Sequence, residues 1–161
     1  MAVVRSGEHS ATGAPGDGAQ QGQRKVVVQI SAHPTELPPL RLVAADLAAR
    51  ADFDLDTVAD LRLAVDEAAS ELVAAATPDA SLTCVFTLDD ERMVVTASVP
   101  ARDGARLRQD SFGWRVLTTL VDEVHVTGDS GADPPQLGIS LCKRRSALHD
   151  DVVDSALTEG H

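Results

Sequence analysis

LRLAVDEAASELVAAA, residues 61–76, is the most regular stretch of this chain. In it and just before it, apolar residues recur at steps of three and four, the spacing of a helix face that packs on a core. They are Val58, Leu61, Val65, Ala68, Leu72 and Ala76. The pattern predicts a long amphipathic helix, with Asp54 or Asp56 as its N-cap and Thr77-Pro78-Asp79 as its end.

Two carboxylates, Glu67 and Glu71, lie one turn apart on a neighbouring face of this helix. No lysine or arginine stands one turn from either, and two like charges at this spacing destabilise an isolated helix by about 0.2–0.5 kcal/mol. The pair fits a solvated acidic face, and it also fits a site for a nucleotide and magnesium. Spacing alone leaves both interpretations open.

Shorter apolar runs on both sides of this helix predict further elements. We expect strands at 26–30, 81–88, 93–99, 123–127 and 137–143, and helices at 40–50 and 112–120. His33-Pro34 and Pro38-Pro39 are expected to break the chain before the first helix. The order of elements predicts an α+β two-layer sandwich, with helices on one face of a mixed, mostly antiparallel sheet.

The two ends of the chain differ in composition from its middle. Residues 1–24 are rich in Gly, Ser, Gln and Ala and have no apolar periodicity, which indicates a disordered N-terminal arm. One domain is expected over residues 25–145. Residues 146–161 have little pattern and are expected to form a frayed C-terminal tail, in which 147–157 allows a short helix.

Acidic residues outnumber basic ones by 25 to 14, which gives a formal charge of −11. Such a surface repels nucleic acids and anionic membranes, so we expect neither as a direct ligand, and it suits a basic protein partner. Aromatic residues are only 2% of the chain, so the core must be built from valine, leucine and alanine. No apolar run is long enough for a signal peptide or a membrane span, so we expect a cytoplasmic protein.

Several single residues have simpler interpretations. Cys84 and Cys142 are expected to be buried free thiols, although strand order alone leaves their proximity open. Trp114 is interpreted as a core or interface residue, and His125 as a half-buried strand residue rather than a ligand. Lys143-Arg144-Arg145 fits a solvated strand end or a partner-docking patch. The histidines and cysteines lack metal-ligand spacing, and no serine has a nucleophile-elbow context.

Three segments carry a resemblance to a known family. AVDEAASELV, residues 64–73, resembles the first helix motif of the GHKL ATPases, specifically the bacterial anti-sigma factor serine kinases. SFGWRVLTTLVDEVHV (111–126) resembles the family's glycine-led helix and the strand after it, and LGISLCKRR (137–145) resembles its closing strand. The resemblance covers about residues 25–145, is close to the anti-sigma-F factors of actinobacteria, and implies the GHKL (Bergerat-type) fold.

The resemblance implies roles for the two carboxylates. In an active member the motif glutamate is the general base or positions a water, and an asparagine four residues later holds magnesium. Glu67 matches the glutamate, whereas Glu71 stands in place of the asparagine. A carboxylate can bind magnesium, but without the metal it repels the phosphates.

The resemblance also implies a nucleotide-binding turn at 99–104, where an aspartate accepts from adenine and glycines admit the ligand. Either Ala101 occupies the aspartate position, or Asp103 replaces it with Gly104 following one residue too early. The lid segment 105–111 has no glycine, and Gly113 alone represents the phosphate-facing turn. Gly138 remains in the closing strand, where it fits a nucleotide contact, close packing or a bulge.

These residues lead to two hypotheses within the family and one outside it. The first is an anti-sigma factor with an eroded nucleotide site and no cofactor. It would sequester a stress-response or other alternative sigma factor as a homodimer and be released by an anti-anti-sigma factor of the STAS type. The second is an active Mg-ATP-dependent serine kinase that phosphorylates that anti-anti-sigma partner, with Glu67 as base. The third is an unrelated α+β interaction module in which the glutamate pair is merely surface.

Overall fold

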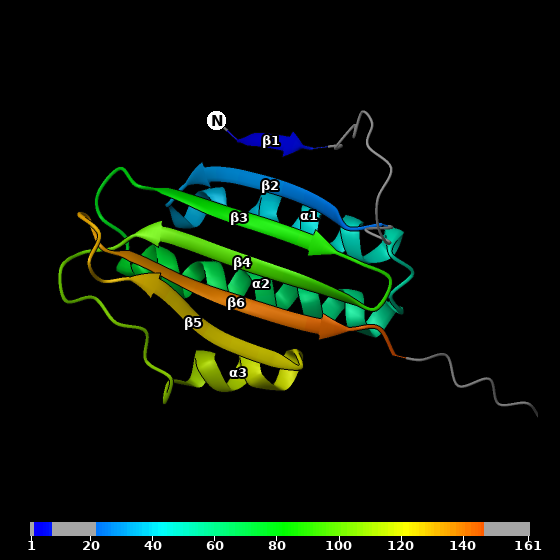
Figure 1. Cartoon of the computed structure of the whole chain (residues 1–161). Helices are drawn as coiled ribbons and strands as arrows, with labels where there is room; N and C mark the ends of the chain where they lie inside the picture. Colours follow the sequence, from blue (N-terminus) through cyan, green and yellow to red (C-terminus); the bar gives the residue numbers. More distant parts are fainter. Residues whose placement is uncertain (1, 8–21, 147–161) are drawn as a thin grey trace, which may run out of the picture.

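The computed structural model describes residues 2–7 and 22–146 as a sheet covered by three helices (Figure 1). The strands are β1 (Val3–Ser6), β2 (Arg24–Ser31), β3 (Ser81–Leu88), β4 (Arg92–Pro100), β5 (Glu123–Asp129) and β6 (Gln136–Arg144). The helices are α1 (Pro38–Arg50), α2 (Leu55–Ala75) and α3 (Phe112–Leu120), and a short 3₁₀ turn, η1 (Pro34–Glu36), precedes α1.

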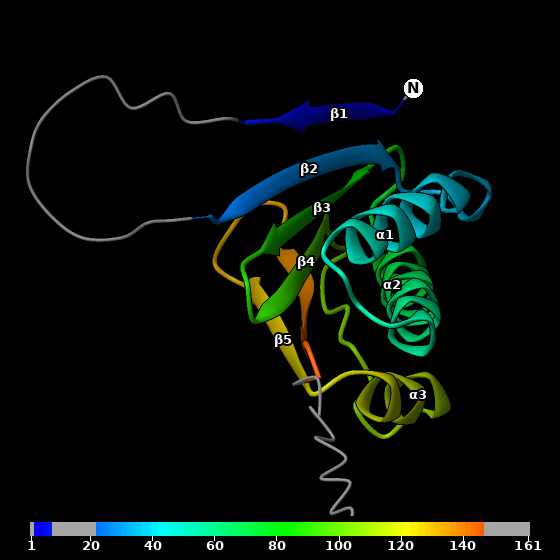
Figure 2. The ribbon, with the colours of Figure 1, turned by 90° about the vertical axis from the view of Figure 1, so that its right-hand side faces the viewer.

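The six strands form one sheet in the order β1-β2-β3-β4-β6-β5, and every neighbouring pair in it is antiparallel. All three helices lie on the same side of this sheet (Figure 2). The predicted α+β sandwich is therefore confirmed. None of the helices in the described ranges is long and apolar enough to cross a membrane.

Strand alternation and small helix residues build the core between the two layers. On β3 and β4 every second residue is buried, as expected for a sheet with one covered face. The predicted stripe of α2 faces this surface, with Leu61, Val65, Ala68 and Leu72 at 2% exposure or less. The alanines of α2 let the helix approach the sheet closely. The core is therefore filled without the large aromatic side chains that the composition lacks.

The ends of the helices follow from local chemistry. Asp54 is the N-cap of α2, because its carboxylate accepts hydrogen bonds from Thr57 N at 2.9 Å and Thr57 Oγ1 at 2.8 Å. The backbone hydrogen bond from Thr57 lowers the pKa of Asp54. The prediction that Pro38-Pro39 break the chain was wrong, since α1 begins at Pro38. Proline is tolerated in the first turn of a helix, where the missing N–H would have no partner.

The N-terminal arm differs from its prediction over Val3–Ser6, which pairs with β2 as an edge strand. Val3 and Val4 are 41% and 56% exposed, so backbone pairing rather than burial holds β1. A strand without a buried face leaves no apolar periodicity in the sequence. Residues 8–21, and the tail 147–161 with its possible helix, lie outside the described residues.

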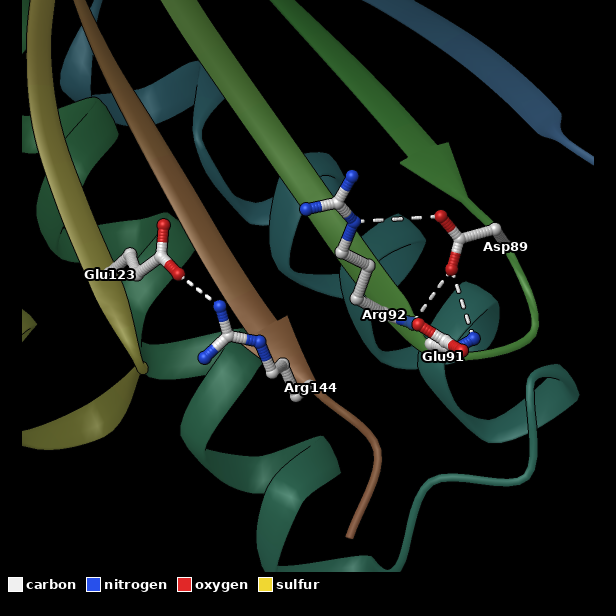
Figure 3. A network of polar contacts seen from close by, with 5 residues as sticks. All are labelled: Asp89, Glu91, Arg92, Glu123 and Arg144. Carbon is white, nitrogen blue, oxygen red and sulfur yellow. Dashed lines mark hydrogen bonds and ion pairs between the residues drawn. The ribbon is translucent and has the colours of Figure 1, made fainter. Parts of the chain in front are cut away.

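The side chains of the basic run 143–145 bind their own chain, as Figure 3 shows for Arg144. Arg144 pairs with Glu123 of β5, and Lys143 Nζ donates to Leu120 O at 3.1 Å. Arg145 donates to Ala51 O and lies 5.9 Å from the centre of the Phe53 ring. Neither a purely solvated end nor a free docking patch describes these side chains fully, because they connect β6 to β5, to the end of α3 and to the α1–α2 connection.

The same view shows the β3–β4 turn, where Asp89 accepts from Glu91 N and Arg92 N, each at 2.9 Å (Figure 3). The hydrogen bond from Glu91 N is the main reason that the pKa of Asp89 is lowered. On β5 the prediction of a half-buried His125 was wrong. Its side chain is 68% exposed and 3.6 Å from Glu123, because β5 is the edge of the sheet.

The two cysteines cannot meet. Cys84 lies on β3 and Cys142 on β6, with β4 between them. Cys84 pairs with Ala97, which faces the helices, whereas Cys142 pairs with Val94 on the other face. Both thiols are buried and free, as predicted, and burial raises the pKa of Cys84 to about 12.

Candidate functional site

A cavity of about 400 Å³ lies between the C-terminal half of α2 and the loop that leads from β4 to α3. Its lining comprises Glu71, Ala74, Ala75, Arg102, Ala105, Arg106, Leu107, Arg108 and Ser111. The segment that the resemblance assigned to the lid therefore does cover this part of α2. Of the residues proposed for the site, only Glu71 lines the cavity directly.

Glu67 lies just outside the lining to which Glu71 belongs, and both side chains lie against the first turn of α3. Ser111 is the N-cap of that helix and accepts a hydrogen bond from Trp114 N at 3.1 Å. Gly113, the second residue of the helix, is buried and faces the two carboxylates. A Cβ on Gly113 would come closer than 3.0 Å to Glu67 Oε1 and to Glu71 Oε1. The structure therefore brings Glu67, Glu71 and Gly113 together.

The electrostatics of this contact are unusual for a surface pair. Burial is the main reason that the pKa of Glu67 is raised, followed by repulsion from Glu71 and then from Asp66. Asp66 pairs with Arg41 at 3.4 Å, whereas neither Glu67 nor Glu71 has an ion-pair partner in the described ranges. The first turn of a helix attracts negative charge, which offsets part of this repulsion.

The predicted adenine turn lies elsewhere in the site. Ala101, at the aspartate position, is 2% exposed and donates its N–H to Pro135 O at 2.7 Å. Asp103 and Gly104 form an exposed turn that is closed by Ala105 N donating to Arg102 O at 3.0 Å. Gly104 has a φ of 73°, which explains the glycine. Asp103 is thus not brought to the buried position that Ala101 occupies.

Gly138 is explained by packing of the strands. It lies opposite Ser98 on β4 and Thr127 on β5. A Cβ there would come within 2.8 Å of Ala97 O and would also collide with Thr127 Oγ1. Among the three uses that the sequence allowed for Gly138, close packing accounts for this glycine.

The sequence analysis missed three arginines of the cavity lining, one just before the lid segment and two within it. Arg102, Arg106 and Arg108 all line the cavity. Arg102 donates from its guanidinium to Ala74 O at the end of α2, and Arg108 pairs with Asp110 at 3.3 Å. Three arginines within seven positions of an acidic chain were the available signal. Trp114 packs partly buried against the core, as predicted, whereas Phe112 beside it is 82% exposed.

The fold and the site together define the class to which this protein belongs. On one face of an antiparallel sheet, a helix carries paired carboxylates, a lid segment covers part of that helix, and the N-terminus of a second helix lies against the carboxylates. The chain belongs to the histidine kinase-like ATPase domain family, which matches residues 30–133. It is 38% identical over 137 residues to the anti-sigma-F factor RsbW of Mycobacterium tuberculosis, covering 83% of this chain and 81% of that protein. The same values hold for RsbW of strain CDC 1551 and of strain H37Rv. The chain is thus a homologue of an anti-sigma factor, which excludes the unrelated interaction module.

Proposed function

We propose that this protein is an anti-sigma factor that sequesters an alternative sigma factor by binding alone, with an eroded nucleotide site. Its similarity to an anti-sigma-F factor supports the partner class. The formal charge of −11 supports attraction to a sigma factor, since DNA-binding proteins need basic surfaces. Release by an anti-anti-sigma factor and assembly as a homodimer belong to this proposal.

The contact of Glu67 and Glu71 with Gly113 is the main observation in support of an eroded nucleotide site. Phosphates bind well at a helix N-terminus because its N–H groups and dipole favour anions. Here two carboxylates approach that turn of α3 from α2. A triphosphate at the same place would face both charges, and the raised pKa of Glu67 indicates that this environment already disfavours negative charge.

The lid supports the same conclusion. Segment 105–111 supplies no glycine whose backbone could wrap closely around phosphates. Ala101 offers no side-chain acceptor for an adenine amino group, and Asp103 is exposed in its turn. The protein would therefore hold its partner without a nucleotide.

An active serine kinase is the second candidate, and two observations favour it. Glu67 is retained, and a raised carboxyl pKa suits a general base. Arg102, Arg106 and Arg108 also put positive charge on the cavity wall, where it could meet phosphates in place of glycine N–H groups. A kinase must bind Mg-ATP and lose transfer to the partner serine on Glu67→Ala.

Binding to a panel of purified alternative sigma factors, with and without Mg-ATP, tests the proposal. We expect one sigma factor to bind with a dissociation constant of about 1 μM or tighter without nucleotide. Mg-ATP and Glu67→Ala should each change that constant by less than about twofold. Failure to bind any sigma factor, or binding that requires Mg-ATP, would contradict it.

A further inference from the structure

A second and larger cavity, of about 590 Å³, lies at the same end of α2 but against the segment 32–37, which contains η1 and precedes α1. Its apolar lining includes Pro34 and Leu37 from the η1 segment, Val73 and Ala74 from α2, and Pro78 after the helix. Cavities of this size with mainly apolar walls and a few polar groups are typical small-molecule sites. Neither Glu67 nor Glu71 lines it.

Charge in this lining is confined to two side chains, Arg102 and Asp79, with His33 as the other titratable group. His33 Nδ1 is already engaged with Thr35 Oγ1 at 2.8 Å. Asp79 is exposed in the turn after α2. The Arg102 guanidinium donates to the Ala74 carbonyl and has no ion-pair partner among the described residues. Its remaining donors can therefore receive an anion.

Arg102 also belongs to the lid cavity, and Ala74 lines both cavities too. The Arg102 guanidinium therefore lies at the boundary between the two cavities, hydrogen-bonded to the last turn of α2. The lid segment begins three residues after it. An anion that drew Arg102 away from Ala74 O would alter the wall of the lid cavity.

We propose that the larger cavity binds a small organic anion with an apolar body, of the aromatic carboxylate or sulfonate class. The apolar walls would cover the ring, and the charged group would form a charge-assisted hydrogen bond with Arg102. Asp79 opposes this binding through its charge, so the anionic group lies toward Arg102. Because Arg102 also lines the lid cavity, such a ligand would contact a residue that the two cavities share.

The probe is 8-anilinonaphthalene-1-sulfonate, an aromatic sulfonate whose fluorescence rises in apolar sites. N-phenyl-1-naphthylamine, which has a similar ring system without the sulfonate, is the neutral control. We expect saturable binding of the sulfonate that weakens about tenfold in Arg102→Gln, as for loss of a hydrogen bond to a charged group. Asp79→Asn should strengthen it, and the neutral probe should bind wild type and Arg102→Gln alike.

Two further variants separate the cavities. Val73 lines only the larger cavity and Arg106 only the lid cavity. Val73→Phe should abolish saturable binding of the sulfonate, while Arg106→Gln should leave it unchanged, with thermal melts establishing that each variant is folded. Absence of saturable binding to the wild type would overturn the proposal. So would equal affinity in Arg102→Gln, or loss in Arg106→Gln with retention in Val73→Phe. Sigma binding is not involved, so this result is independent of the proposed function.

Discussion

Gly113 of α3 packs directly on the carboxylate of Glu67 from α2, at a distance that leaves no room for a Cβ. The two residues are far apart in sequence and come from different helices. Their contact joins the motif carboxylate to the helix N-terminus that would otherwise be open to an anion. Glu67 is partly buried there, and burial is the main reason that its pKa is raised.

Gly113→Ala should push the carboxylates of Glu67 and Glu71 outward, because the ends of both side chains can move. Since burial is the main cause of the raised pKa of Glu67, that pKa should fall toward its ordinary value. Carboxyl-detected NMR titration measures it. Gly104→Ala is the matched control, since nothing lies within 4 Å of a Cβ there. An unchanged Glu67 pKa in Gly113→Ala would refute the contact.

Glu67→Gln should stabilise the protein at neutral pH. A carboxyl whose folded pKa is raised above the unfolded one costs stability when it is ionised, and this cost disappears as pH falls through the folded pKa. The melting temperature of Glu67→Gln should therefore exceed that of wild type at pH 7, with a difference that narrows as the pH falls through the folded pKa of Glu67 and is lost below the unfolded one. A difference in melting temperature that grows as the pH falls would contradict this prediction.

Gly128→Ala should be much more damaging than Gly104→Ala, although both glycines have positive φ, of 154° and 73°. A Cβ on Gly128 would collide with the backbone carbonyl of Gln136, which cannot move without breaking the β5–β6 pairing. We expect a loss of about 2 kcal/mol or more in the free energy of unfolding for Gly128→Ala and about 1 kcal/mol for Gly104→Ala. Urea titration compares them, and equal losses would contradict the clash.

The thiols should be unreactive in the folded protein. Burial raises the pKa of Cys84 to about 12 and also raises that of Cys142, so little thiolate exists at pH 8. Labelling with Ellman's reagent should be slow in the native state and reach both cysteines in guanidinium chloride. Because the side chains lie on opposite faces of the sheet, an oxidant should form no intramolecular disulfide, and finding one would mean that the strand register is wrong.

Strong periodicity made most of the fold predictable. The α2 stripe and the alternation of β3 encode burial on one face, so both elements could be placed from the sequence. The edges were less predictable. β1 buries neither of its valines and was missed, whereas β5 was expected as a strand and only the exposure of its His125 was not. Proline was misjudged at Pro38, where position in the first turn decides its effect.

The candidate site was only partly predictable for a different reason. Glu67, Glu71 and Gly113 could be named from a motif, but their mutual contact depends on how α3 docks on α2. The arginines of the cavity lining form no sequence motif. Only the structure shows that Arg102 and Arg106 line the same cavity. Asp103 and Ala101 are two residues apart, but Ala101 is buried where it bridges to Ala76, whereas Asp103 lies in the exposed turn that follows.

Calorimetric titration of the folded protein with Mg-ATP, and with ADP as a control, tests the eroded site most directly. The account predicts no measurable binding at nucleotide concentrations up to about 1 mM, because Glu67 and Glu71 already lie against the α3 N-terminus. A dissociation constant for Mg-ATP in the micromolar range would contradict it. The retained Glu67 would then be the base of an active serine kinase.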